Sequence, residues 1–138
     1  MTSTVARICS ELISLDTSNY GDGSGPGEAS AAEYVEAFLR GCGLEPERFS
    51  TSSATRQVVV CRVPGEDPSA EALVVHAHLD VVPAVAQDWS VPAFEGTLHD
   101  GMVWGRGAVD MKDMDAMILT VVQQWQLHGI RPRRDIVL

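Results

Sequence analysis

Residues 73–112 constrain the fold more than any other stretch of this sequence. The stretch begins with an apolar run that is typical of a buried strand, and the run leads directly into His76, His78 and Asp80. A loop with several glycines follows, and a helical pattern starts at Asp110. Ligands of open α/β sheets sit just outside the carboxyl ends of strands. Imidazoles and a carboxylate at a strand end, with a second aspartate at a helix start, therefore indicate a metal site.

The spacing of apolar residues predicts three helices and at least four strands. Apolar residues recur every three or four positions at about residues 4–15, 28–40 and 111–128, which is helical spacing. Gly129 and Pro132 supply stop signals for the last helix. A hairpin is expected within residues 96–104, around the Asp100–Gly101 turn. Short apolar or valine-rich segments favour strands at residues 44–49, 57–63, 72–77 and 135–138.

These elements predict an α/β fold with a mixed central sheet and helices on both faces. The strands at 57–63 and 72–77 are joined by a short connection, which favours their antiparallel pairing. The chain has 138 residues, enough for one domain with a core of its own. Its last segment, 135–138, is apolar and strand-like up to the final residue, so we expect a chain that is cut within a larger domain.

Charge and cysteine usage exclude several classes of protein. The net charge is −9 and there is no basic tract, which argues against a nucleic-acid partner and against an anionic membrane surface. No apolar window approaches the length of a membrane span, and Glu11 and Asp16 interrupt any signal-like region. Cys9, Cys42 and Cys61 form no Cys-x-x-Cys pair. We expect free thiols and a cytoplasmic location.

Two blocks of residues resemble the signature of the co-catalytic zinc metallopeptidases and deacylases. The first is His78-x-Asp80 with the Val-Val-Pro that follows it, and the second is Gly105-Arg-Gly-Ala-Val-Asp-Met-Lys112. That family includes acetylornithine deacetylase, succinyl-diaminopimelate desuccinylase, aminoacylase, carnosinase-type dipeptidases and glutamate carboxypeptidase. Weaker similarity reaches upstream, so the resemblance covers nearly the whole chain. The matching residues between and before the two blocks are Trp89, Pro92, Phe94, Asp100–Gly101, and residues 15–19, 31–34 and 43–45.

The resemblance implies a role for three side chains. The position of His78 ligates one zinc ion, and the position of Asp80 acts in catalysis by orienting the ligand histidine. The position of Asp110 bridges two zinc ions, and in relatives the peptide bond after it is often cis. Read from the residues alone, an aspartate at a helix start is commonly a simple N-cap. A histidine beside a turn aspartate is commonly a satisfied core residue.

The string His76-x-His78-x-Asp80 also occurs in two other kinds of hydrolase. Metallo-β-lactamase-type enzymes place a further histidine directly after the aspartate, where this chain has Val81. Amidohydrolase barrels open with His-x-His on their first strand, but a barrel needs eight strand–helix units, more than this chain can supply. We therefore expect His76 to bind no metal and to serve the strand or support the site.

Other residues in the second block and in the loop before it have less specific expected roles. We expect Gly105 and Gly107 to serve tight backbone geometry. Arg106 is expected to brace the loop through a carboxylate rather than to bind substrate. Trp89 and Phe94 suit two readings equally, lining of the site and ordinary packing within the loop.

As a whole, the resemblance implies a hydrolase that cleaves an amide bond in a small peptide or an N-acyl amino acid. Two zinc ions, with cobalt or manganese as alternatives, would activate the attacking water. The general base belongs to an acidic pair beyond the strand that starts at Asp135, and a dimerising lid domain follows later. Residues 1–138 would then be the N-terminal portion of the catalytic domain, inactive alone. The alternative is a truncated, non-catalytic chain with little or no bound metal.

Overall fold

A computed structural model describes residues 3–138 of the chain. Its three α-helices are α1 (Thr4–Ile13), α2 (Ala29–Gly41) and α3 (Lys112–His128), and a short 3₁₀ helix, η1, spans Ala86–Asp88. The Ser3 hydroxyl caps α1 by accepting a hydrogen bond from the Ala6 N–H at 3.4 Å. Gly129 ends α3 in the left-handed conformation, with φ 63°, which glycine adopts without a Cβ penalty. The three predicted helices are confirmed, with ends shifted by up to two residues.

Seven short strands form three small sheets. β1 and β2 pair antiparallel, β5 and β6 form a hairpin, and a third sheet has the order β3-β7-β4. The hairpin expected around Asp100 and Gly101 is confirmed, and Asp100 has φ 50° at its turn. The strand bounds are β1 Glu47–Ser50, β2 Gln57–Val60, β3 Arg62–Val63, β4 Leu73–Val74, β5 Thr97–His99, β6 Met102–Trp104 and β7 Ile136–Val137.

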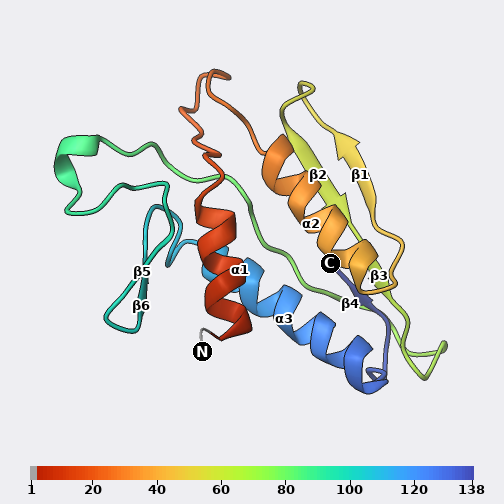
Figure 1. The fold of residues 1–138 in the computed structure, drawn as a ribbon. Coiled ribbons are helices and arrows are strands. Elements are labelled where there is room, and N and C mark those ends of the chain that lie inside the picture. The colour runs from red at the N-terminus through yellow and green to blue at the C-terminus, as the bar shows by residue number, and fades with distance from the viewer. Residues whose placement is uncertain (1–2) are drawn as a thin grey trace.

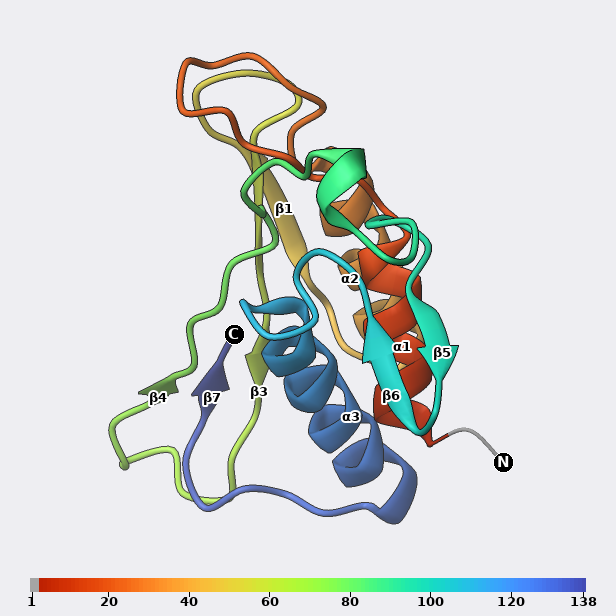
Figure 2. The ribbon, with the colours of Figure 1, turned by 90° about the vertical axis from the view of Figure 1, so that its left-hand side faces the viewer.

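The expected antiparallel pairing of segments 57–63 and 72–77 is wrong. β7 lies between them and pairs antiparallel with β3 and parallel with β4. The connection between β3 and β4 forms no hairpin. It runs away from the sheet, and β7 lies between the two strands (Figure 2). Asp135 holds this corner: its carboxylate accepts a hydrogen bond from the Gly65 N–H at 2.7 Å and pairs with Arg62. The sheet is therefore mixed, as expected, with a different neighbour order.

The helices and strands form two layers. Figure 1 shows the three helices on one side and strands β1–β4 and β7 on the other. Among residues 3–138 we see no helix on the second face of these strands, where helix cover was expected. The hydrophobic core lies between the layers, and a few polar side chains, among them Lys112, are buried beside it. Its fully buried members are Ile8, Cys9, Leu12, Ile13, Leu39, Cys61, Val63, Ala116, Leu119, Val122 and Ile136.

The strand β4 is less buried than its sequence suggests. Leu73 and Val74 are 50% and 67% exposed, although the apolar run predicted a buried strand. The reason is its place in the sheet: β4 is an edge strand, with β7 on one side only. Val58 and Val60 of β2 are also exposed, so a group of valines faces solvent on the strand side of the molecule.

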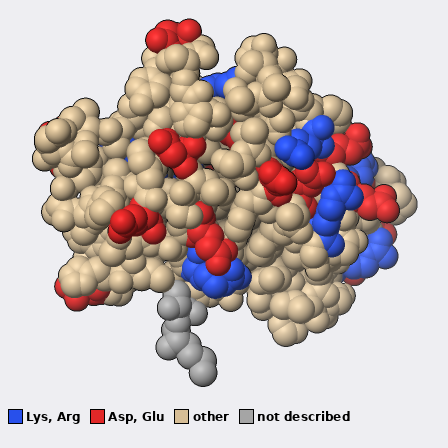
Figure 3. All heavy atoms as spheres, turned by 45° about the horizontal axis from the view of Figure 1, so that its top comes forward, with Lys and Arg blue, Asp and Glu red and all other residues tan. Residues whose placement is uncertain are grey.

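The thiols and surface charges agree with the composition. Cys9, Cys42 and Cys61 are free, and burial raises the pKa of the Cys9 thiol to about 11. Figure 3 shows basic side chains next to acidic ones on the side of α2 and β1, where Glu36 pairs with Arg40 and Arg48. None of the helices in residues 3–138 combines the length and apolar character needed to cross a membrane.

Candidate metal-dependent site

The segment from Val75 to Val81 carries the candidate site residues, and both of its ends are fixed. At its start, the Val75 N–H donates to the Val137 carbonyl of β7 at 2.8 Å. At its end, the Val81 N–H donates to the Thr17 carbonyl at 3.1 Å, and the Thr17 hydroxyl donates to the Leu79 carbonyl at 2.6 Å. Thr17 is fully buried. The loop after α1 therefore sets the backbone from which His78 and Asp80 project.

His78 lies between two aspartates. Its Nδ1 is 3.0 Å from the Asp80 carbonyl oxygen and 3.4 Å from Asp80 Oδ1, and its Nε2 is 3.0 Å from Asp110 Oδ1. An Nδ1–H that donates to Asp80 leaves the Nε2 lone pair facing the Asp110 carboxylate. Two acceptors at this separation need a positive charge between them, either a ring proton or a bound cation. Burial lowers the pKa of His78, but the hydrogen bonds with Asp80 and Asp110 outweigh it and raise the pKa.

Asp110 is open to solvent at the start of α3. Its side chain is 86% exposed, and the peptide bond to Met111 is cis, as the resemblance implies. The helix begins at Lys112 with Met111 in the N-cap position, and no side chain caps it. The alternative reading of Asp110 as an N-cap is therefore wrong. Its carboxylate faces His78, 32 positions earlier in the chain.

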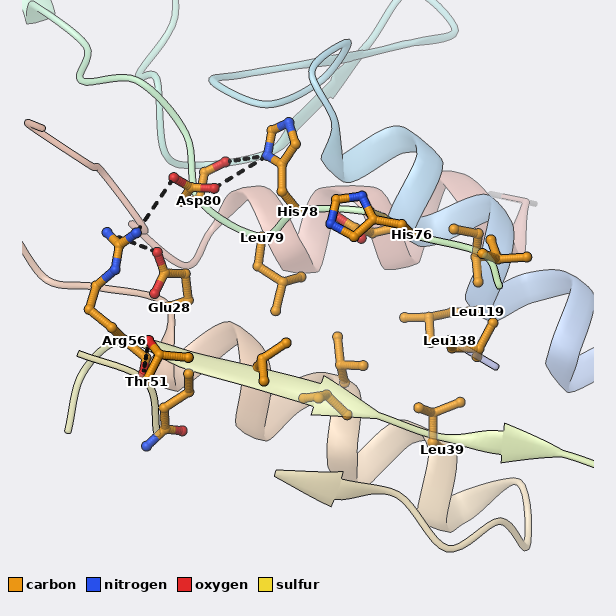
Figure 4. A pocket seen from close by; sticks show the side chains of 18 residues that line it. Glu28, Leu39, Thr51, Arg56, His76, His78, Leu79, Asp80, Leu119 and Leu138 are labelled. Atoms are coloured by element: carbon orange, nitrogen blue, oxygen red, sulfur yellow. Dashed lines mark hydrogen bonds and ion pairs between the residues drawn. The ribbon is translucent and has the colours of Figure 1, made fainter. Parts of the chain in front are cut away.

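Asp80 is held in place by residues to which the sequence analysis assigned no role. Asp80 Oδ2 accepts a hydrogen bond from the Asn19 side-chain amide at 2.7 Å and lies 4.0 Å from Arg56 Nη2. Arg56 Nη1 is 3.0 Å from Glu28 Oε1, and Glu28 is buried. Figure 4 shows this chain of charges running from Glu28 through Arg56 to Asp80 and His78. These partners fix the carboxylate that orients the imidazole.

A cavity of about 310 Å³ opens beside His78 and Asp80. One of its walls carries Asp115, which is 8% exposed and whose Oδ2 atom has no hydrogen-bond partner among residues 3–138. Burial raises the pKa of Asp115 to about 7, although the charges of His78 and Lys112 act in the opposite direction. The other lining residues come from α2, β2, α3 and the segment after β4. They are Glu28, Val35, Leu39, Thr51, Arg56, Gln57, Val58, Val59, Val75, His76, Ala77, His78, Leu79, Asp80, Ile118, Leu119 and Leu138.

Lys112 anchors the beginning of α3 from inside the core. Its side chain is fully buried, and its ammonium group donates to the carbonyls of Leu12 at 2.9 Å and Leu15 at 2.7 Å. The first carbonyl belongs to the last turn of α1 and the second to the loop that follows this helix. Burial lowers the pKa of Lys112 to about 8, with Asp115 and Asp16 opposing that shift. Only Met111 separates Lys112, with its buried ammonium group, from the exposed Asp110 in the chain.

The remaining predicted residues lie around this centre. A Cβ on Gly105 would stand 2.4 Å from Ile13 Cγ2, and both Gly105 and Gly107 have positive φ, so their role in tight backbone geometry is confirmed. Arg106 does brace a loop, but its partners are the Pro83 carbonyl and the Trp89 ring, not the predicted carboxylate. Trp89 and Phe94 line a separate hollow and not the cavity beside His78. His76 lines the cavity, and its lack of a metal role stays a prediction.

The donor set of this centre fits part of a zinc site. An imidazole nitrogen and a carboxylate oxygen are ordinary zinc ligands, and the carboxylate on the far ring nitrogen is the usual support of a ligating histidine. The part of the chain that the structure describes contains no group of three or more such side chains close enough to hold an ion. His78 and Asp110 thus supply two donors, fewer than the three or four protein ligands that zinc usually takes.

The chain thus combines an α/β fold with a partial set of metal-binding side chains, His78 and Asp110. Residues 74–138 match the sequence profile of peptidase family M20/M25/M40. Three curated relatives match most of the chain. They are the N-fatty-acyl-amino acid synthase/hydrolase PM20D1 of Bos taurus (35% identical over 115 residues, 80% of this chain), a succinyl-diaminopimelate desuccinylase of Bradyrhizobium sp. strain ORS 278 (33% over 116 residues, 80%) and aminoacylase-1 of Sus scrofa (31% over 105 residues, 75%).

Two solved structures share the fold. Human carnosine dipeptidase 1 superposes with a TM-score of 0.77 over 96% of this chain, and the M20 family metallo-carboxypeptidase Sso-CP2 from Sulfolobus solfataricus with 0.78 over 99%; both are 18% identical. The chain therefore resembles part of the proteins of the M20/M25/M40 peptidase family, whose profile matches residues 74–138. It spans 22%, 29% and 26% of the three curated relatives and 30% of each of the two solved chains.

Proposed function

We propose that this chain is the N-terminal portion of a metal-dependent hydrolase that cleaves an amide bond in a small peptide or an N-acyl amino acid. The observation that carries the proposal is the arrangement of His78 between Asp80 and Asp110. Relatives that bear on the substrate class include a desuccinylase, an aminoacylase and a dipeptidase. The proposed compartment is the cytoplasm, which keeps thiols such as those of Cys9 and Cys61 reduced.

Each of the three side chains has a proposed task. His78 would hold one of two zinc ions through Nε2, and Asp110 would serve both ions through its exposed carboxylate. Asp80 holds Nδ1–H of His78, which fixes the ring tautomer and raises the basicity of Nε2. When bound, the zinc ions lower the pKa of a water ligand and polarise the substrate carbonyl. The resemblance puts the general base on an acidic pair beyond the strand that starts at Asp135.

A second candidate is a chain that binds little or no metal and does not catalyse. The observation that favours it is the two-donor set, since residues 3–138 hold no cluster of three metal-binding side chains. Zinc titration of the purified chain, followed by calorimetry and by the absorption spectrum of the cobalt-loaded form, separates the two candidates. A spectrum with imidazole and carboxylate ligation supports the first, and no binding up to millimolar metal supports the second.

Three variants assign the residues. We expect His78→Ala to abolish measurable binding, because it removes one of two donors. Asp80→Ala should weaken binding about 10–100-fold, as is typical for the partner of a ligating histidine, with an unchanged circular dichroism spectrum. His76→Ala is the matched control, two positions from His78 in the same segment, and should bind as the wild type does. Equal losses in His76→Ala and His78→Ala would refute the assignment and revive the His-x-His alternatives.

A further inference from the structure

One amide group, the side chain of Asn19, connects the loop after α1 to Asp80. Its Nδ2 atom donates to Asp80 Oδ2 at 2.7 Å, and its Oδ1 atom accepts a hydrogen bond from the Gly21 N–H at 2.9 Å. A backbone N–H can only donate, so the amide atom that faces Gly21 is the oxygen. The nitrogen is therefore turned toward Asp80, and the loop itself fixes which end of the amide meets the carboxylate.

The backbone on both sides of this contact is paired. Ser18 and Val81 form a parallel β-bridge. The Val81 N–H donates to the Thr17 carbonyl at 3.1 Å, and the Asn19 N–H donates to the Val81 carbonyl at 2.8 Å. This register places the side chain of Asn19 beside that of Asp80 without any freedom in the loop backbone between them.

The two carboxylate oxygens of Asp80 have different partners. Oδ2 accepts from Asn19 at 2.7 Å and lies 4.0 Å from Arg56 Nη2, whereas Oδ1 lies 3.4 Å from Nδ1 of His78. Figure 4 shows the contacts of Asp80 with Arg56 and His78. The Asn19 contact is within hydrogen-bond range and the Arg56 contact is beyond it, so Asn19 has the stronger directional hold. Because Oδ2 is bound in this way, Oδ1 is the oxygen that faces the imidazole.

We propose that Asn19 is a positioning residue of the candidate metal site, which holds Asp80 in the rotamer that turns Oδ1 toward Nδ1 of His78. A histidine that ligates a metal through Nε2 needs an acceptor that holds its other ring N–H. Asn19 acts on the imidazole only through Asp80. The inference rests on the proposed function for the role of His78, but the orientation of Asp80 is measurable without metal.

The first test measures the side-chain torsion χ1 of Asp80 in the metal-free chain. Three-bond NMR couplings from the Asp80 carboxyl carbon to the backbone nitrogen and carbonyl carbon report this torsion. We expect the couplings of a single rotamer in the unmodified chain. In Asn19→Ala, where Oδ2 loses its hydrogen bond, we expect couplings averaged over the staggered rotamers. A single, unchanged rotamer in Asn19→Ala would overturn the proposal, as would averaged couplings in the unmodified chain.

Two further variants separate the amide donor from the loop around it. Asn19→Asp keeps an acceptor for the Gly21 N–H but offers no donor to Asp80, so it should also shift the Asp80 couplings away from the wild-type values. Ser24→Ala is the matched control in the same loop. It removes a hydroxyl that donates to Asp22 at 2.6 Å and should leave the Asp80 couplings unchanged. Equal changes in Ser24→Ala and Asn19→Ala would assign the effect to the loop and overturn the proposal.

The second test measures cobalt binding by calorimetry in a double-mutant cycle. Asn19→Ala should weaken binding by up to about tenfold, the lower end of the range for partners of a ligating histidine. In the Asp80→Ala background the same substitution should have no further effect, because Asn19 then has no carboxylate to hold. An equal loss in both backgrounds would overturn the proposal, since Asn19 would then act on the site without Asp80.

The two tests distinguish this inference from the proposed function. If the unmodified chain binds no cobalt but Asn19→Ala averages the Asp80 couplings, the positioning role is supported and the metal-dependent function is not. If the chain binds cobalt and Asn19→Ala changes neither the affinity nor the couplings, the proposed function is supported and the role of Asn19 is overturned.

Discussion

The two sides of α3 differ in how completely their polar groups are paired. On the side of α1, Lys112 is fully buried, and its ammonium group reaches two backbone carbonyls within 2.9 Å. On the side of the cavity beside His78, Asp115 is nearly as buried, but one of its oxygens has no partner among residues 3–138. The two residues are less than one helical turn apart. On the α1 side the buried ammonium group is paired with backbone carbonyls. On the cavity side a buried carboxylate oxygen has no partner among the described residues.

The candidate site residues that surround the cavity also lie on only one side of α3. His78, Asp80 and the cavity all lie on the side of Asp115, and the helix-packing side holds none of the candidate site residues. A rigid α1–α3 pair can position Asp110 without taking part in binding, since Lys112 fixes the helix start two residues later. Binding groups held on a rigid scaffold keep their geometry better than groups on mobile loops.

The largest expected effect is the pH dependence caused by Asp115. Its pKa of about 7 in the folded chain exceeds that of an unfolded aspartate, about 3.9. Between these values the folded chain keeps a proton that the unfolded chain has lost, so stability falls as the pH rises from about 4 to 7. Each pKa unit is worth about 1.4 kcal/mol, so the wild type should lose on the order of 4 kcal/mol more over this range than Asp115→Asn does.

Urea unfolding at pH 4 and pH 7 measures this difference directly. Glu71→Gln, which removes an exposed carboxyl away from the cavity, is the control and should follow the wild type. If Asp115→Asn showed the same pH dependence as the wild type, the Asp115 carboxyl would be ionised or partnered in solution. The contrast between the two sides of α3 would then disappear.

Lys112→Met should destabilise the chain by about 3 kcal/mol, because hydrogen bonds to charged groups are worth roughly 1.5–3 kcal/mol each and the cost of burying the ammonium group offsets part of two such bonds. The measurement is the free energy of unfolding in urea at pH 7. Met117→Ala on the exposed side of the same helix should cost less than about 1 kcal/mol. Similar losses in both variants would show that the α1–α3 interface does not depend on the buried ammonium group.

The smallest effect is expected at Val74, on the open face of the strands. Val74 is 67% exposed, so Val74→Thr should change the free energy of unfolding by no more than about 0.5 kcal/mol. It should also reduce self-association in sedimentation velocity, since exposed apolar groups promote contacts between molecules. The matched variant Val63→Thr places a hydroxyl at a fully buried position of the same sheet and should cost about 1–3 kcal/mol. A large loss at Val74 would mean that this face is covered in solution.

The elements that the sequence predicted correctly are those decided by neighbouring residues. The three helices and the Asp100–Gly101 hairpin follow from spacing and turn residues a few positions apart. The order β3-β7-β4 could not be predicted in this way. A short connection favoured pairing of β3 with β4, but Ile136 and Val137 pair with the same edges from 63 to 75 residues further along the chain.

The residues of the candidate site differ in the same way, between those found from local motifs and those whose partners are distant in sequence. The motif spacing singled out His78, Asp80 and Asp110, and the structure brings them into contact, while their metal-binding roles stay predictions. The role of Asn19 could not be predicted, since nothing local links it to Asp80, which lies 61 positions away. The buried ammonium group of Lys112 could not be foreseen either, because lysine is among the residues that are almost never fully buried.

The position of β7 also sets an order of events during synthesis. β3 and β4 join one sheet only through hydrogen bonds with residues 136 and 137, which lie between them. The mixed sheet can therefore form only after the helix α3 has been synthesised. Contacts between residues far apart in sequence form slowly, because the intervening chain must first be ordered. While the chain is on the ribosome, α1 and α2 can form early, but the backbone edges of β3 and β4 remain without hydrogen-bond partners. In that interval these edges are exposed to other chains, and a chaperone that shields extended apolar segments would act there.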